Sequence, residues 1–141
     1  MQKFSFEAIM VVFIAGFLAS VSGAEVFQAS TSVIVPVDND GVQRISITVD
    51  SYSYTPNHLQ VEVGKPVELI LNSVTMITPH NFVVKEPAAG LMIDGDVPAG
   101  KTEIIRFTPT QRGLFAFYCD KKLLFFKSHR DKGMEGLLDV R

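Results

Sequence analysis

Apolar residues recur at every second position in several segments of this chain. Three such segments follow one another: Ile45, Ile47 and Val49; Leu59, Val61 and Val63; Val67, Leu69 and Leu71. A period of two places alternate side chains on one face of an extended chain. Each segment therefore predicts a β-strand with one buried face.

Turn-forming residues separate these segments. Residues 38–41 read Asp-Asn-Asp-Gly, residues 64–66 Gly-Lys-Pro and residues 98–101 Pro-Ala-Gly-Lys, and glycine and proline at such points favour chain reversal. Further strands are predicted at residues 33–35, 81–84, 102–107, 114–119 and 137–141. Short strands at this spacing, without a long amphipathic helix, predict an all-β fold, an antiparallel β-sandwich.

The first 24 residues differ from the rest of the chain. Lys3 precedes an apolar stretch over residues 8–19, and the small residues Ser22 and Ala24 follow it, an order typical of a secretory signal peptide. We predict cleavage after Ala24, or after Gly23, which fits almost as well. The uncharged run over residues 8–24 is close to the shortest membrane span, so an uncleaved anchor is the alternative. We favour cleavage and expect no membrane anchor.

Removal of residues 1–24 from the 141 leaves a mature domain of 117 residues, 25–141, which is enough for one domain with a single core. One lysine and one glutamate lie in the removed segment, so the net charge stays at -2. Nucleic-acid-binding domains usually carry a basic surplus. We therefore expect no nucleic-acid partner.

Cys119 is the only cysteine of the chain. In an exported protein it has no partner for a disulfide, so metal binding or burial would have to protect the thiol. By the period of two, Cys119 shares a strand face with Phe115 and Phe117, which places the thiol at the end of a core-facing row. The sequence at this point leaves two interpretations open, a metal ligand or a small buried hydrophobic residue.

Two histidines and a methionine favour the metal. His80 lies at the start of a predicted strand, and Cys119, His129 and Met134 lie on one segment between the last two predicted strands. Taken singly, each histidine is more typical of a polar surface residue and Met134 of core packing. Together, a thiolate, two imidazoles and a thioether are the ligand set of a one-electron copper site with a weak axial sulfur.

The same motifs resemble those of the cupredoxins, the blue copper proteins that include plastocyanin and azurin. The resemblance rests on Pro79-His80-Asn81, the Phe-x-Phe-x-Cys run that ends at Cys119, and His129-x₄-Met134-x-Gly136 before a last strand. It implies a Greek-key β-sandwich with one copper ion. It further implies His80, Cys119 and His129 as equatorial ligands, Met134 as the axial ligand, and Asn81 as the residue that ties the two ligand loops together by hydrogen bonds.

The interval between Cys119 and His129 departs from plastocyanin. Nine residues lie between them, more than in the small blue copper proteins and close to the eight of the nitrite reductase copper domain. The extra length contains Leu123, Leu124, Phe125 and Phe126. These residues form either a docking patch beside His129 or a short helix packed on the core, and exposed apolar patches are the rarer case.

The sequence thus predicts an exported, periplasmic if bacterial, copper protein that carries single electrons between larger redox proteins. The alternative is a periplasmic copper-binding or delivery protein. Three histidines in all are too few for an oxidase-type copper centre, so we expect neither an enzyme nor a small-molecule substrate. The segment after Cys119 has a local charge of +3, which leaves two interpretations open: the charge orients the copper edge toward an acidic partner, or the basic residues only solvate a long loop. Its basic residues are Lys121, Lys122, Lys127, Arg130 and Lys132.

Overall fold

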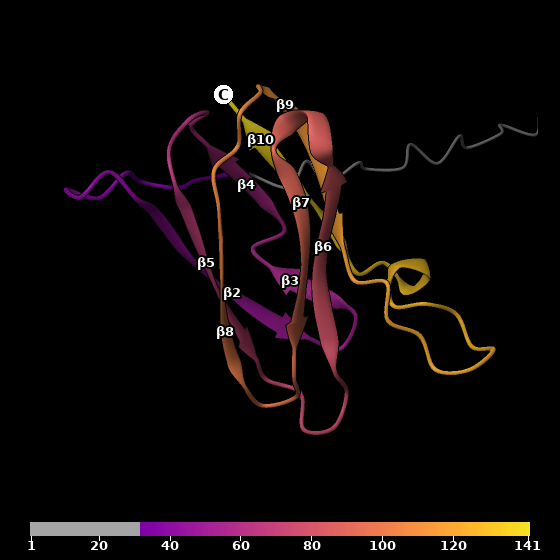
Figure 1. The fold of residues 1–141 in the computed structure, drawn as a ribbon. Helices are drawn as coiled ribbons and strands as arrows, with labels where there is room; N and C mark the ends of the chain where they lie inside the picture. The colour runs from indigo at the N-terminus through magenta and orange to yellow at the C-terminus, as the bar shows by residue number, and fades with distance from the viewer. Residues whose placement is uncertain (1–31) are drawn as a thin grey trace, which may run out of the picture.

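The computed structural model describes residues 32–141, which form two β-sheets packed face to face (Figure 1). The larger sheet has the strand order β1 (Val33–Ile34), β4 (His58–Val61), β10 (Glu135–Val140), β9 (Gly113–Tyr118), β6 (His80–Glu86) and β7 (Leu91–Val97). The smaller sheet has the order β3 (Ser53–Thr55), β2 (Gln43–Asp50), β5 (Val67–Ser73) and β8 (Thr102–Phe107). Two short 3-10 helices, η1 (Pro87–Ala89) and η2 (Arg130–Lys132), lie in the connections. The predicted all-β sandwich is confirmed.

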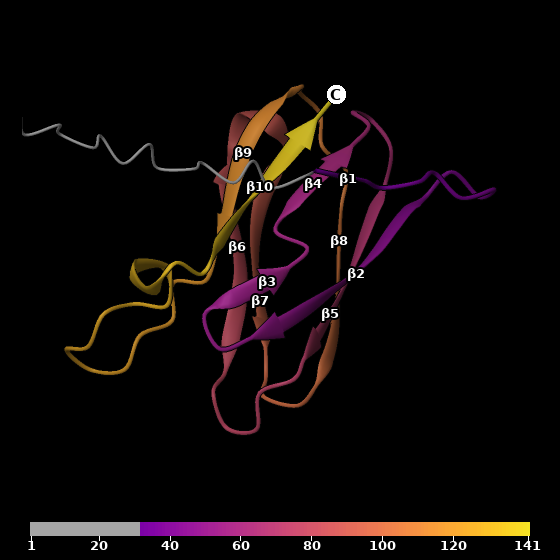
Figure 2. The same cartoon turned by 180° about the vertical axis from the view of Figure 1, so that it is seen from behind.

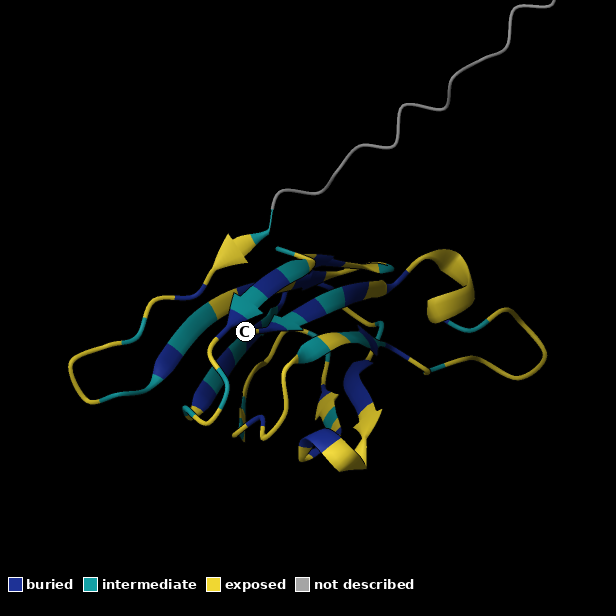
Figure 3. Ribbon diagram, turned by 90° about the horizontal axis from the view of Figure 1, so that it is seen from above, coloured by how far each residue is buried: buried dark blue, intermediate teal, exposed yellow. Residues whose placement is uncertain are grey.

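The core lies between the sheets, and the alternating residues fill it. Strand β5 buries every second side chain, Val67, Leu69 and Leu71. Strands β4 and β10 also bury every second residue, and Figure 3 shows such alternation along several strands, whereas β6 buries five residues in a row. Phe82 of β6 stacks on Phe117 of β9 at 4.7 Å between ring centroids. The apolar pattern of the sequence therefore becomes one continuous core beneath the end of β9 where Cys119 lies.

Both sheets are mixed, so the expectation of a purely antiparallel sandwich is wrong. Strand β2 pairs in parallel with β5, and β4 pairs in parallel with β10, whereas β9 runs antiparallel to β10 and to β6 (Figure 2). The period of two is the same for parallel and antiparallel pairing. Alternation in the sequence therefore indicates which side chains face the core and leaves the direction of the neighbouring strand open.

Strands β3 and β7 are the two strands that the sequence pattern did not predict. Strand β3 has only three residues. Strand β7 carries Asp94, Gly95 and Asp96, residues that are depleted in strands. A Cβ at Gly95 would contact the side chain of Ile105, so the glycine permits close packing of β7 against β8.

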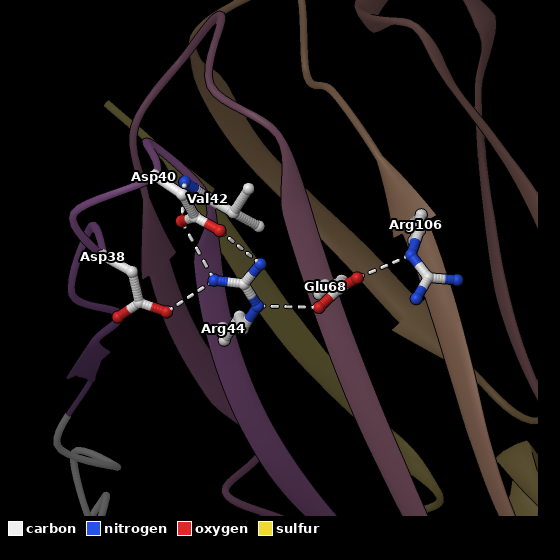
Figure 4. Close-up of polar contacts among 6 residues, drawn as sticks. All are labelled: Asp38, Asp40, Val42, Arg44, Glu68 and Arg106. Atoms are coloured by element: carbon white, nitrogen blue, oxygen red, sulfur yellow. Dashed lines mark hydrogen bonds and ion pairs between the residues drawn. The ribbon is translucent and has the colours of Figure 1, made fainter.

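Charged residues cross the outer face of the smaller sheet (Figure 4). Arg44 of β2 binds Asp38 and Asp40 of the preceding turn and Glu68 of β5, and Glu68 also binds Arg106 of β8. The guanidinium of Arg44 lowers the pKa of Asp40 to about 2. These contacts link three neighbouring strands near the start of β2. The N–H of Gly41 donates to the carbonyl of Asp38, which confirms residues 38–41 as a turn.

The predicted signal peptide, residues 1–24, lies outside the described residues. Within residues 32–141, no helix has the length and apolar character needed to cross a membrane.

Candidate metal centre

Cys119 follows directly after strand β9 and is fully buried. The predicted strand face is confirmed, because Phe117 is buried and Phe115 packs against the core. The thiol sulfur accepts a hydrogen bond from the backbone N–H of Asn81, with 3.4 Å between the nitrogen and the sulfur. Burial raises the pKa of the Cys119 thiol.

Two histidines meet this sulfur from different elements. His80 is the first residue of β6, and His129 directly precedes η2. The Cys119 Sγ atom lies 3.3 Å from His129 Nδ1 and 3.9 Å from His80 Nδ1, and the two Nδ1 atoms are 3.2 Å apart. Residues that are 39 and 49 positions apart in the chain thus form one buried three-donor cluster.

Both imidazoles favour the neutral form. Burial lowers the pKa of His80 to about 4, with a smaller contribution from the neighbouring His129. Burial and the charge of Lys132 also lower the pKa of His129. A neutral imidazole nitrogen can donate its lone pair to a metal. At neutral pH the two histidines therefore need not lose a proton before they bind a metal ion.

Met134 lies between the cluster and strand β10 and is fully buried. Its backbone N–H donates to the carbonyl of His129, and its own carbonyl accepts from the N–H of Cys119. These two hydrogen bonds connect Met134 to both Cys119 and His129. The predicted placement of Cys119, His129 and Met134 on one connection between the last two strands is confirmed.

Asn81 of β6 connects this strand to the segment after β9, and two carboxylates that were not predicted to take part bind its side-chain amide. The Asn81 Nδ2 group donates to Asp94 at 3.0 Å and to Asp120 at 2.8 Å, while its Oδ1 atom accepts from the N–H of Asp120 at 3.1 Å. The position of Asp120 next to Cys119 was a signal for this role. Asp94 lies on the unpredicted strand β7, so the sequence offered no comparable signal.

Two tyrosines support the site, Tyr54 from strand β3 and Tyr52 from the turn between β2 and β3, and neither was predicted. The Tyr54 hydroxyl donates to the carbonyl of Asn81 at 2.5 Å, and burial raises the Tyr54 pKa. The ring of Tyr52 contacts His129 edge-on at 5.0 Å, and Lys132 lies over the same tyrosine ring. Contacts between sheets depend on tertiary packing, which the local pattern around residues 52–54 does not contain.

The segment between Cys119 and His129 does not form a helix on the core. Leu123, Leu124, Phe125 and Phe126 are all exposed, so the packed-helix interpretation is wrong. A hollow of about 540 Å³ lies beside this segment, and Tyr52, Ile77, Leu123, His129 and three lysines are among the residues that line it. His129 therefore faces a partly apolar, positively charged depression.

The family model described as a cupredoxin-like domain matches residues 8–133. The chain belongs to the cupredoxin-like family. The match ends one residue before Met134, so the family comparison itself does not reach the fourth candidate ligand of this cupredoxin. None of the curated proteins compared with the chain matches it significantly.

Several solved structures share the cupredoxin fold of this chain. The metal-binding domain of the Cu(I)-exporting P-type ATPase CopA of Streptococcus pneumoniae D39 is 24% identical with a TM-score of 0.62, over 79% of this chain and 97% of that chain. Auracyanin A, a blue copper protein from Chloroflexus aurantiacus, is 19% identical with a TM-score of 0.54, over 72% and 100%. A multicopper oxidase is 18% identical with a TM-score of 0.59, over 75% and 45%. At these identities the shared property is the fold.

The donor set of this cupredoxin fits copper as its cofactor. Imidazole and the soft sulfur ligands thiolate and thioether together suit copper, and two histidines with one cysteine and a nearby methionine are the donors of trigonal copper sites. Donor atoms bound to one ion at about 2.0–2.3 Å lie roughly 3–4 Å apart. The separations of 3.2–3.9 Å within the cluster meet this condition.

Proposed function

We propose that this cupredoxin is an exported electron carrier with one copper ion held by His80, Cys119, His129 and Met134. The observation that carries the proposal is the convergence of two Nδ1 atoms on one buried thiol sulfur. Copper bound there supplies one-electron chemistry by alternating between Cu(I) and Cu(II). We propose no enzymatic activity, and the count of three histidines in the chain supports this.

The surrounding residues support electron transfer because they hold the donors in place. Asn81 binds the Cys119 sulfur through its N–H and the next residue, Asp120, through its side chain. The Cys119 N–H bonds to the carbonyl of Met134. Donors fixed by such contacts rearrange little when the charge of the bound ion changes, which favours rapid exchange of single electrons.

We further propose a larger redox protein as the partner, docked at the hollow beside His129. Three lysines line the hollow, Lys121, Lys122 and Lys132. Lys121 pairs with Asp96 and Lys132 lies over the ring of Tyr52, whereas Lys122 makes no ion pair within residues 32–141. The electron-transfer rate with an acidic redox protein should fall as salt is added, because salt screens exposed charges over roughly 10 Å at 0.1 M. Lys122→Glu should slow it at low salt, whereas Lys65→Glu, at a turn remote from the site, should not.

The second candidate function is copper delivery. The fold of this chain is similar to that of the CopA metal-binding domain, which was solved with Cu(I), and to that of a copper-binding protein solved in the apo form. A delivery protein would use similar ligands and would release its metal to an acceptor. Export through the signal peptide of residues 1–24, to the periplasm in a bacterium, is part of the proposal for either function.

Redox cycling in the presence of a chelator distinguishes the two functions. The copper-loaded protein should accept one electron per chain, return it on oxidation and keep its copper through several cycles with a modest Cu(I) chelator present. Copper content after removal of the chelator is the readout. Transfer of the copper to the chelator on the first reduction would support delivery and contradict the carrier function.

A further inference from the structure

The loop that precedes His129 extends away from the sandwich (Figure 1). We call residues 121–129 the finger. A hydrogen bond from the N–H of His129 to the carbonyl of Lys121 closes its base, and a second from the N–H of Phe126 to the carbonyl of Leu123 forms the turn at its tip. Leu124 within this turn has a φ of 49°, a conformation that leucine rarely adopts. The finger is thus an ordered turn with an apolar tip.

Four large apolar side chains occupy this turn and face solvent. Leu123, Leu124, Phe125 and Phe126 are 68%, 70%, 89% and 57% exposed. Turns usually contain glycine, proline, asparagine or aspartate, and contiguous exposed apolar groups usually mark an interaction surface. The backbone hydrogen bond between Leu123 and Phe126 pairs one donor and one acceptor at the tip, which lowers the cost of moving the turn into an apolar medium.

Cations stand on both sides of the apolar tip. Lys122 precedes it and Lys127 follows it, and within residues 32–141 neither makes an ion pair. The nearby Asp131 carboxylate accepts hydrogen bonds from the N–H and the hydroxyl of Ser128 and keeps its negative charge, and both lysines help to lower its pKa. The finger itself contains three lysines and no acidic residue, so its charge stays positive with Asp131 counted, next to a tip that carries no charge.

We propose that the finger docks on an anionic lipid bilayer, with Leu124 and Phe125 in the interfacial apolar zone and Lys122 and Lys127 at the headgroups. The finger is apolar at its tip and cationic toward its base. A bilayer changes in the same order, from acyl chains at its centre to anionic headgroups at its surface. A bilayer also accepts a convex tip without a complementary pocket. This docking is independent of the metal and of any N-terminal anchor. Leu124 and Phe125 do not line the hollow beside His129, so insertion of the tip leaves the hollow to the redox partner.

A tryptophan reporter tests the proposal directly, because the chain contains no tryptophan. The full chain with Phe125→Trp is mixed with vesicles of equal parts phosphatidylglycerol and phosphatidylcholine. Its emission should shift to the blue, and lipids brominated near the top of the acyl chain should quench it. Leu123→Trp is a second reporter on the same tip. Ile104→Trp, at an exposed apolar position of β8, is the matched control and should not shift.

Charge removal completes the test. In the Phe125→Trp background, Lys122→Gln with Lys127→Gln should weaken partitioning into the anionic vesicles by roughly 25-fold, since each lysine near an anionic surface contributes about fivefold. Pure phosphatidylcholine vesicles should bind the parent reporter weakly. Because the reporter senses only the surroundings of residue 125, binding through residues 1–24 alone would leave its emission unchanged.

Three results would overturn the proposal. The first is unshifted emission from both finger reporters with anionic vesicles. The second is equal partitioning into neutral and anionic vesicles. The third is a blue shift that depends on protein concentration without vesicles, which would assign the tip to a second copy of the chain.

Discussion

Burial favours the protonated thiol of Cys119, whereas metal binding favours the thiolate. The thiol is fully enclosed and its pKa is raised, whereas a metal needs the thiolate. The N–H of Asn81 at 3.4 Å offers the sulfur a donor that favours the anionic form. Copper binding should therefore displace the thiol proton, and the thiolate should dominate the spectrum of the site.

Substitution of the two sulfur ligands should separate their roles. Cys119→Ser should abolish the intense visible band, because no thiolate is left to transfer charge to the ion. Met134→Leu should keep the copper and shift the reduction potential, since a weak axial ligand tunes the site more than it binds the ion. Absorption spectra and potentiometry give both results. An intense band that persists in Cys119→Ser would show that the proposed ligand set is wrong.

His80 should make the metal-free protein sensitive to acid. Its pKa is about 4 in the folded chain and 6.5 is its ordinary value, so between these pH values the unfolded state binds more protons than the folded state. Stability should be full above pH 6.5 and fall as the pH drops toward 4, by on the order of 3 kcal/mol. Urea unfolding across this range measures it. His80→Phe should flatten the slope, and an unchanged slope would exclude His80 as its source.

Individual elements differ in how far their sequence determines them. Strands β2, β4 and β5 follow from alternation, and β8 has the predicted limits of residues 102–107. Strand β7 was missed because Asp94 and Asp96 interrupt its apolar pattern. Asp94 is also the residue that binds the side-chain amide of Asn81. The finger was ambiguous because four consecutive apolar residues have neither the period of a strand nor that of a helix.

The candidate site was predictable in its residue types and order, and less so in its surroundings. Cys119, His129 and Met134 lie close together in sequence, and their types alone indicate a copper-binding set. The contributions of Tyr54 and Tyr52 come from β3 of the other sheet and from the turn before it. Such contacts depend on how the two sheets pack, which a local pattern of side chains does not specify.

Strand β10 depends on close packing at Gly136, which the motif after Met134 singles out. A Cβ there would overlap the carbonyl oxygen of Asn57 and the ring of Phe117. Gly136→Ala should therefore destabilise the fold by about 1–3 kcal/mol. Denaturant unfolding measures this effect.

Gly133→Asn serves as the control for Gly136→Ala. Gly133 has a φ of 94° with open space around it, and asparagine tolerates left-handed backbone conformations. This variant should lose less than about 1 kcal/mol. Equal losses in the two variants would contradict the packing explanation.

In the whole molecule, the charged cluster around Arg44 and the candidate metal site around His129 lie at opposite ends of strand β2. The charged residues around Arg44 link β2, β5 and β8 near the start of β2. Tyr52, just beyond the end of β2, contacts His129. The metal cluster, the hollow and the finger thus adjoin one another. This arrangement suits a carrier that presents its copper and its docking surfaces together.

One copper ion should bind this cluster through the thiolate of Cys119. The decisive measurement is a titration of the purified protein with Cu(II), followed by visible absorption and by metal analysis. We expect an intense thiolate-to-copper charge-transfer band that rises linearly and stops at one copper per chain. A colourless complex, or a band that continues to grow beyond one equivalent, would show that Cys119 does not hold a single copper ion in this way.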